Sequence, residues 1–208
     1  MAKRPTVSII IPVWGDYFKY LPKCLDSIQA QTYDNYEIII VENNTDLPSA
    51  RNVGVKRAKG EYILPLDVDD WIKPDYLEKT VGKGDIVITH VELPHSKNHC
   101  FGWEIKPEAF VIRNQLIACS LFKKEVWEKI GGYDESMVDG YEDWDFWWRA
   151  SNAGYKFTVI HEPLYYYNWR EKGSMLENTN KKADKIKQYL INKNYGTTKT
   201  DQKTKTHI

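Results

Sequence analysis

Cysteine is scarce in this chain of 208 residues, and its three copies follow no metal-binding pattern. Cys24, Cys100 and Cys119 are widely separated and odd in number, which indicates reduced thiols rather than a disulfide framework. The first apolar run, after Met-Ala-Lys-Arg-Pro, is only as long as one strand, which is too short for a usual signal peptide or a membrane span. We therefore expect a cytoplasmic protein without a membrane span.

A net charge of either sign is also missing, because 29 basic residues balance 29 acidic ones. This balance excludes the basic field typical of nucleic-acid-binding proteins, so no nucleic-acid partner is expected. The local exception is the segment 179–208, which holds eight lysines against two aspartates. We expect a basic helix from Lys181 to Asn192 and then a solvated tail, a composition that also suits weak contact with an anionic membrane.

No glycine-rich phosphate loop follows the first apolar run, where the sequence reads Pro-Val-Trp-Gly-Asp-Tyr. The Gly-x-Gly-x-x-Gly fingerprint of Rossmann dehydrogenases is therefore excluded. A nucleotidyltransferase that makes an activated sugar would also need a glycine-rich loop at this place.

Strands and helices are expected to alternate through the first third of the chain, which is long enough for one domain with a sizeable core. In the order strand, helix, strand, helix, strand, the expected elements are Thr6–Ile11, Tyr17–Ala30, Tyr36–Val41, Ala50–Ala58 and Tyr62–Leu66. Pro12 is expected to end the first strand, and Ser49 to cap the second helix. This order predicts right-handed βαβ units, a parallel sheet and hence an α/β fold.

Three carboxylates, Asp67, Asp69 and Asp70, follow the third expected strand within four residues. Such a cluster repels itself unless a cation compensates it, and open α/β sheets bind ligands at this end of their strands. Hard oxygen ligands suit Mg²⁺ or Mn²⁺ shared with substrate phosphates. An EF-hand would need an acid or amide at Trp71 and glycine at Ile72, and an Asp-x-Asp-x-Thr phosphatase would need a hydroxyl at Trp71. A metal–diphosphate site is the preferred interpretation, and a solvated acidic turn is the alternative.

Three segments together carry a family resemblance: Ser-Ile-Ile-Ile-Pro-Val-Trp, Tyr-Glu-Ile-Ile-Ile-Val-Glu-Asn-Asn-Thr-Asp, and the run from Ala-Arg-Asn-Val-Gly to Leu-Asp-Val-Asp-Asp. In this order and at this spacing they resemble the family 2 glycosyltransferases. The resemblance implies the glycosyltransferase-A fold, a Rossmann-like, mostly parallel sheet flanked by helices, and inverting transfer from a nucleotide sugar. It also implies a catalytic domain over residues 1–178, with a nucleotide-sugar half (1–91) and an acceptor half (92–178).

The resemblance assigns the nucleotide side of the site to the ends of the first two strands. Pro12, Val13 and Trp14 match the segment that lines the nucleotide. Glu42 matches an acid that accepts a hydrogen bond from the base, which suits the N–H of uracil because an ionised carboxylate only accepts. The alternative for Glu42 is a polar residue that opens a loop.

The same resemblance assigns the metal to the acidic turn. Asp69 matches a ligand of the metal that bridges the two phosphates, and Asp67 would face the ribose and contribute to the metal site. Arg51 matches a residue near the base, with an ordinary helix cation as the alternative.

A second motif region, Gly132–Ala150, resembles the acceptor side of the family, in which a Glu-Asp pair opens a helix. Asp143 matches the general base, which takes the proton of the attacking acceptor hydroxyl. Glu142 and Trp144 are expected to contact the acceptor, Trp144 by stacking. The alternative for the acids is that they only stabilise the start of the helix through its dipole. Trp144, Trp147 and Trp148 fall at helical spacing, and two of these three rings are expected to pack in the core.

The remaining segments are less informative. Strands are expected over Asp85–Val91, Tyr155–Ile160 and Leu164–Asn168, and a helix over Lys123–Ile130, ended by two glycines. Residues 92–110 are expected to form a variable connection, in which His95 and His99 are solvated loop residues rather than metal ligands.

The segment Pro163–Met175 resembles a closing Tyr-Tyr-Arg-x-His-x-x-Ser motif of the family, but Asn168 replaces its Arg and Arg170 replaces its His. In relatives that His can complete the metal site, so its absence here leaves the identity of a third protein ligand open. We expect Arg170 to bind a phosphate instead, which a guanidinium does with two hydrogen bonds.

The sequence as a whole predicts a metal-dependent, inverting glycosyltransferase that moves a sugar from a nucleotide diphosphate, preferably UDP, to a hydroxyl of a glycan or other acceptor. The missing His motivates an alternative, a non-catalytic module of the same fold that binds a nucleotide sugar or a glycan.

Overall fold

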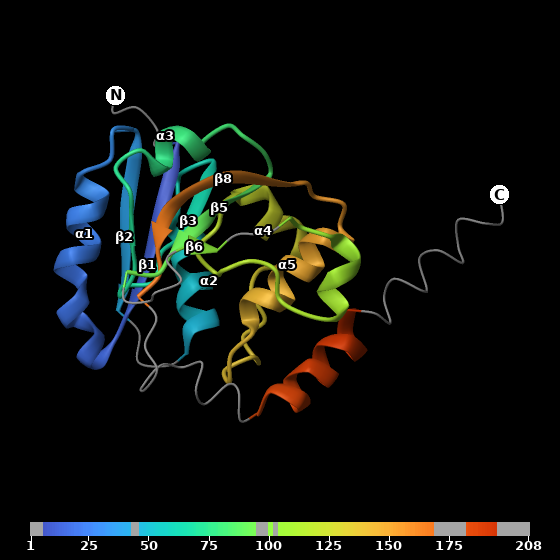
Figure 1. The fold of residues 1–208 in the computed structure, drawn as a ribbon. Helices are drawn as coiled ribbons and strands as arrows, with labels where there is room; N and C mark the ends of the chain where they lie inside the picture. Colours follow the sequence, from blue (N-terminus) through green and yellow to red (C-terminus); the bar gives the residue numbers. More distant parts are fainter. Residues whose placement is uncertain (1–5, 43–45, 95–99, 102–103, 169–181, 195–208) are drawn as a thin grey trace.

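The protein folds around one mixed β-sheet that helices cover on both faces (Figure 1). The computed structural model describes residues 6–42, 46–94, 100–101, 104–168 and 182–194. The strands are β1 (Val7–Val13), β2 (Tyr36–Glu42), β3 (Tyr62–Pro65), β4 (Trp71–Ile72), β5 (Ile86–Glu92), β6 (Cys100–Phe101), β7 (Leu121–Lys123) and β8 (Phe157–Tyr166). The helices are η1 (Gly15–Tyr20), α1 (Leu21–Gln29), α2 (Leu47–Arg57), α3 (Tyr76–Thr80), η2 (Pro107–Val111), α4 (Lys124–Ile130) and α5 (Glu142–Asn152). A further helix spans residues 182–194 and is called helix 182–194 below.

The strand order is β2-β1-β3-β7-β5-β8-β4, with β6 paired to β5. The long ladders, β1 with β2 and β5 with β8, are parallel, as is β1 with β3. β7 joins the two parallel groups by pairing antiparallel with both β3 and β5. The expected α/β fold and the strands β1, β2, β3 and β5 are therefore confirmed, while the two strands expected between Tyr155 and Asn168 form one strand, β8.

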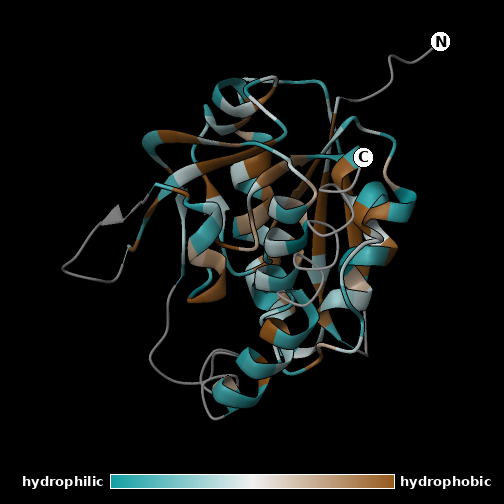
Figure 2. Ribbon diagram, turned by 90° about the vertical axis from the view of Figure 1, so that its right-hand side faces the viewer, coloured by the Kyte–Doolittle hydropathy of each residue, from teal (hydrophilic) through white to brown (hydrophobic). Residues whose placement is uncertain are grey.

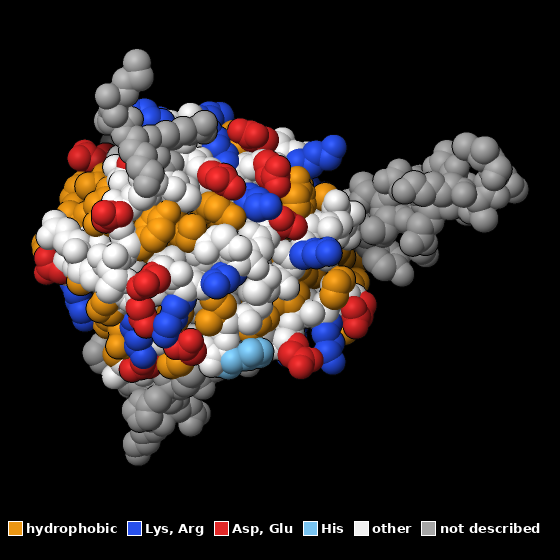
Figure 3. Space-filling view, turned by 90° about the horizontal axis from the view of Figure 1, so that it is seen from above, with side chains coloured by type: hydrophobic (Ala, Val, Ile, Leu, Met, Phe, Trp, Pro, Cys, Tyr) orange, Lys and Arg blue, Asp and Glu red, His pale blue; other side chains and the backbone are white. Residues whose placement is uncertain are grey.

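Alternating side chains of the strands build two separate cores, because successive residues of a strand point to opposite faces. Ile9 and Ile11 pack with α1 and α3, whereas Ile10 packs with α2, α4 and α5. Figure 2 shows the hydrophobic strands enclosed by helices with hydrophilic outer surfaces. Acidic and basic side chains are mixed over the face drawn in Figure 3, in agreement with the zero net charge.

Two expected element boundaries are wrong. Pro12 does not end β1 but lies within it, opposite Val41 of β2. The carbonyl of Ile10 accepts a hydrogen bond from the Leu66 N–H on the β3 side, and β3 does not pair with β1 beyond this point. The nitrogen of Pro12 lies on the same side of β1 as that carbonyl. Because β3 has already ended there, the lack of an N–H on Pro12 costs no hydrogen bond of the sheet. The second helix begins at Leu47 rather than near Ala50.

The cap of that second helix, α2, is Asp46 and not Ser49. The Asp46 carboxylate accepts a hydrogen bond from the Ser49 backbone N–H at 2.8 Å, with Pro48 in the first turn. Gly54 lets α2 lie directly against β1, because a Cβ at this position would collide with the side chain of Ile10. This close packing brings Arg51 of α2 to the ends of the strands.

None of the helices in the described part of the chain has both the length and the apolar character needed to cross a membrane.

Candidate functional site

The acidic turn lies where β3 ends, next to the ends of β1 and β2. Val13 pairs with Glu42 in the parallel ladder, so the expected nucleotide-lining residues and Glu42 share one edge of the sheet. Glu42 is exposed, and Trp14 is partly exposed with its ring centroid 5.4 Å from that of Tyr17. Arg170, the expected phosphate ligand, lies outside the described residues, as do His95 and His99.

The three aspartates of the turn differ in burial. Asp67 and Asp69 are partly exposed, whereas Asp70 is 3% exposed. A hydrogen bond of 2.9 Å from the Asp70 N–H to the Asp67 carbonyl closes the turn. Only Asp67 and Asp69 therefore present carboxylates toward solvent.

Asp70 has a structural role that the sequence did not indicate. Its carboxylate accepts a hydrogen bond from the hydroxyl of Tyr165, and a second one, 2.7 Å long, from the backbone N–H of Asn168. Burial and the charges of Asp69 and Asp67 raise the pKa of Asp70 well above its ordinary value. These bonds join the acidic turn to the end of β8.

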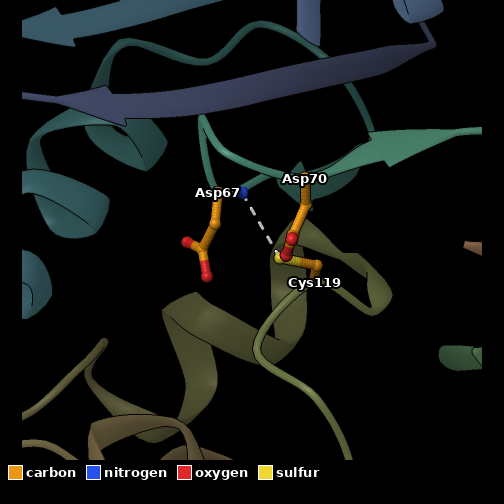
Figure 4. Close-up of side chains that lie close together, drawn as sticks. All are labelled: Asp67, Asp70 and Cys119. Carbon is orange, nitrogen blue, oxygen red and sulfur yellow. Dashed lines mark hydrogen bonds between the residues drawn. The ribbon is translucent and has the colours of Figure 1, made fainter. Parts of the chain in front are cut away.

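Cys119 lies beside the turn, a contact that its isolated position in the sequence did not indicate. Its sulfur accepts a hydrogen bond from the Asp67 N–H at 3.3 Å, and Figure 4 shows the Asp70 carboxylate directed at the same sulfur. The ligand atoms of Asp67, Asp70 and Cys119 lie within 4.8 Å of one another. Burial raises the pKa of the Cys119 thiol well above its ordinary value, so the sulfur stays protonated.

This chemistry decides which groups suit a hard divalent cation. A neutral thiol is a poor ligand for Mg²⁺ or Mn²⁺, and both oxygens of Asp70 already accept hydrogen bonds. Asp67 and Asp69 remain as partly exposed carboxylates on one turn, which matches the one or two carboxylates that such ions take beside substrate phosphates. The residues present therefore fit a divalent metal at Asp67 and Asp69.

Arg51 is the residue that joins the two halves of the site. Its guanidinium, 1% exposed, donates to Oδ1 of Asp67 at 2.8 Å and also forms an ion pair with Glu142, 91 residues away in sequence. Burial by itself lowers the pKa of Arg51, but the charges of Asp67 and Glu142 help to outweigh this effect and the pKa is raised. Arg51 is therefore neither the ordinary helix cation nor an accessible residue beside the base, because it is enclosed between two carboxylates.

Glu142 and Asp143 open α5, whose preceding residue, Tyr141, has a left-handed backbone (φ 62°). Such a conformation is uncommon for a residue with a side chain, and strained residues of this kind are enriched at functional sites. The Asp143 carboxylate accepts hydrogen bonds from Asn114 Nδ2 and from the Trp144 N–H, each 2.8 Å long. Burial and the neighbouring Glu142 raise the pKa of Asp143 to about 7. Asn114 was missed at the sequence level, because a single amide in a loop carries no pattern.

Three tryptophans of α5 belong to the core. Trp144 and Trp148 are each 4% exposed, and Trp147 is fully buried. The indole N–H of Trp144 donates to the carbonyl of Phe110 at 2.8 Å, and its ring meets Tyr141 edge to face. The Trp144 ring is therefore buried in this structure, and its stacking on an acceptor stays a prediction. Glu142, 5% exposed, is likewise held by Arg51 rather than open to an acceptor.

Comparison with known proteins agrees with this geometry. Residues 8–47 and 42–85 match the family model described as Glycosyl transferase family 2. The putative glycosyltransferase EpsH of Bacillus subtilis is 27% identical over 79% of this chain and 61% of its own length. An uncharacterised glycosyltransferase of Rickettsia typhi, RT0329, is 31% identical over 75% of this chain and 63% of its own length. The chain thus spans somewhat less than two thirds of these relatives.

Solved structures share the fold at low sequence identity. TarS 1-349 of S. aureus in complex with UDP-GlcNAc has a TM-score of 0.68 and 17% identity, over 82% of this chain and 60% of TarS 1-349. The mannosyltransferase PcManGT of Pyrobaculum calidifontis, in complex with GDP-Man and Mn²⁺, has a TM-score of 0.61 and 17% identity, over 88% of this chain and 65% of its own. The fold is that of the glycosyltransferase-A enzymes. Within that class, residues 8–85 of the chain match the family 2 glycosyltransferases.

Proposed function

We propose that this chain moves a sugar from a nucleotide diphosphate, with UDP as the preferred nucleotide, to a hydroxyl of a glycan or other acceptor, inverting the anomeric centre. The observation that carries the proposal is the Arg51 bridge, which holds Asp67 of the acidic turn and Glu142 of α5 to one guanidinium. A transferase needs its donor and acceptor groups in one place, since correct placement of reactants supplies much of its rate. The neighbouring structures in complex with UDP-GlcNAc and with GDP-Man and Mn²⁺ support this donor class.

In this proposal the residues divide the chemistry between two carboxylate groups. Asp143 accepts the proton of the attacking hydroxyl, and a pKa of about 7 suits a base that works near neutral pH. Asp69 and Asp67 would hold Mg²⁺ or Mn²⁺, which supplies charge neutralisation for the departing diphosphate. Glu42, exposed at the end of β2, accepts a hydrogen bond from the base, and Trp14 lines the nucleotide beside it.

The proposal is tested by Asp143→Asn with UDP-sugars, a divalent metal and a panel of acceptors. We expect transfer to fall by about 10²-fold or more, because the base is lost, while UDP binding measured by calorimetry changes by less than about twofold. Asp34→Asn, an exposed acid away from the site, is the matched control and should keep full activity.

A fully active Asp143→Asn variant would remove the base assignment. Wild-type protein that binds UDP-sugars but transfers nothing to any acceptor would instead favour the binding module.

A further inference from the structure

A small pocket lies beside the start of α5, between the loop 136–140 and helix 182–194. Its volume is about 190 Å³. The residues that line it come from both segments: Ser136, Met137, Asp139, Gly140, Lys185, Ile186 and Tyr189. Figure 1 shows helix 182–194, in red, on the same side of the sheet as α5.

Helix 182–194 forms one side of this pocket, and a largely buried polar network holds it against α5 and the loop. Lys193 forms ion pairs with Asp134 (2.5 Å) and with the fully buried Asp145 (3.0 Å). Asn194 donates to the same Asp145 at 3.0 Å. Leu190 has no exposed surface and belongs to the core that includes α5. The wall is therefore positioned by α5, the helix that carries Asp143.

The lining combines an aromatic face with polar groups. Tyr189 is 44% exposed, and its hydroxyl donates to Asp134 at 2.9 Å, which orients the ring. Met137 supplies an apolar floor, and the exposed Asp139 and Lys185 supply charged groups at the rim. Such a lining suits a pyranose, which has an apolar C–H face and a periphery of hydroxyls.

The pocket is continuous with the candidate active site along the chain. Gly140 lines it, Tyr141 follows with its left-handed backbone, and the acids Glu142 and Asp143 come next. The chain segment that lines the pocket therefore leads directly into the segment that carries the base. The small volume matches a single ring rather than a drug-sized ligand, which needs about 300 Å³ or more.

We propose that this pocket is an acceptor subsite that holds one pyranose unit of a glycan against Tyr189 and Met137. The inference rests on the proposed function and assigns the acceptor to the carbohydrates. One side of the subsite, residues 136–140, lies within the Gly132–Ala150 motif region, and the other side comes from helix 182–194, which no motif of the resemblance covers.

Met137 provides a direct reporter, because the protein contains only three methionines. Protein labelled with ¹³C at the methionine methyl groups is titrated with four methyl glycosides: glucoside, galactoside, mannoside and N-acetylglucosaminide. The Met137 signal is assigned by Met137→Leu. We expect at least one glycoside to shift this signal in a saturable manner, with the other two methionine signals unchanged.

Variants separate a binding surface from a structural contact. Tyr189→Ala should weaken the binding of that glycoside by about five- to tenfold, whereas Tyr189→Phe, which keeps the ring, should stay within about twofold. Ile40→Ala, which removes an exposed apolar side chain from β2, is the matched control and should change nothing. In an active preparation, Tyr189→Ala should raise the KM for the acceptor more than it lowers kcat.

The subsite is refuted if no glycoside shifts the Met137 signal, or if Tyr189→Ala and Tyr189→Phe weaken binding equally. The nucleotide side is tested on the same sample by adding UDP and Mn²⁺ and measuring the melting temperature. Stabilisation by UDP without a Met137 shift rejects the subsite alone. A Met137 shift without stabilisation by UDP rejects the proposed function, and with it the acceptor role, but keeps the pocket as a sugar-binding site.

Discussion

At the scale of single residues, Arg51 is the side chain of the site whose loss is expected to lower stability most. A buried guanidinium that neutralises two carboxylates is costly to remove, because each acid is then left in a poorly solvated place without a partner. We predict that Arg51→Gln lowers the free energy of unfolding at neutral pH by about 3–5 kcal/mol, measured by urea denaturation.

The control for this prediction is Arg57→Gln, an exposed cation at the end of the same helix, which should stay within about 0.5 kcal/mol of wild type. Equal effects of the two substitutions would show that the Arg51 bridge does not form in solution.

Asp143 is predicted to lower the stability of the folded protein at high pH, where the base is ionised. Its pKa of about 7 in the folded protein lies above the ordinary value of 3.8, so the folded state holds the proton more tightly than the unfolded chain. Its contribution to stability is complete below about pH 4 and is lost as the pH rises through about 7. Asp143→Asn cannot ionise, so it should melt at a higher temperature than wild type at about pH 8, with a smaller difference at about pH 4. Circular dichroism at both pH values tests this, with exposed Glu128→Gln as the control, and a difference that is independent of pH would contradict it.

At the scale of elements, helix 182–194 is more than the solvated basic segment that its composition indicates. Its lysines explain the local charge, but Leu190 has no exposed surface and Lys193 lies between two acids. We predict that Leu190→Ala costs about 2–5 kcal/mol of unfolding free energy, the usual range for a core leucine. Gln188→Ala, at an exposed position of the same helix, should cost less than about 0.5 kcal/mol. Identical urea midpoints for the two variants would mean that this helix is not packed on α5 in solution.

At the scale of the whole molecule, the proposed nucleotide site exists only when the strand ends are brought together by the fold. Stabilisation of the protein by a nucleotide and a metal therefore tests both the fold and the proposed metal ligands. A ligand that binds only the folded state stabilises it by about 2.7 kcal/mol at a hundred times its Kd, which is about 5–10 °C for a chain of this size. We predict a rise of this order with UDP and Mn²⁺, and its loss with EDTA or in Asp69→Ala. Asp26→Ala, exposed on α1, should keep the full rise. A rise that survives both EDTA and Asp69→Ala would place the metal elsewhere.

Much of the fold was predictable because its signals are local. The β-branched runs of β1, β2 and β5 and the glycine that ends α4 depend on near neighbours in the chain. The short strands β4 and β7 were not predictable, because two or three residues carry no period and pair only when a partner strand is already in place. The continuation of β1 through Pro12 was missed for a related reason, since it depends on where β3 ends.

The candidate site divides in the same way. The acids at the end of β3 and at the start of α5 could be located from their motifs, and their chemical types already indicate a metal and a base. The contacts that set the protonation and burial of these acids could not be predicted from the sequence. The pairs Arg51–Glu142, Asn114–Asp143 and Cys119–Asp67 each join residues that lie far apart in the chain.

The sequence by itself determined which side chain types are present, approximately where the longer strands and helices lie, and which family the motifs resemble. The tertiary structure alone decided that Arg51 and Trp144 are buried, that Asp70 is structural, and that helix 182–194 completes a pocket beside α5. The physical reason is that burial and pairing set the protonation and accessibility of a group, and both depend on packing between distant segments rather than on local pattern.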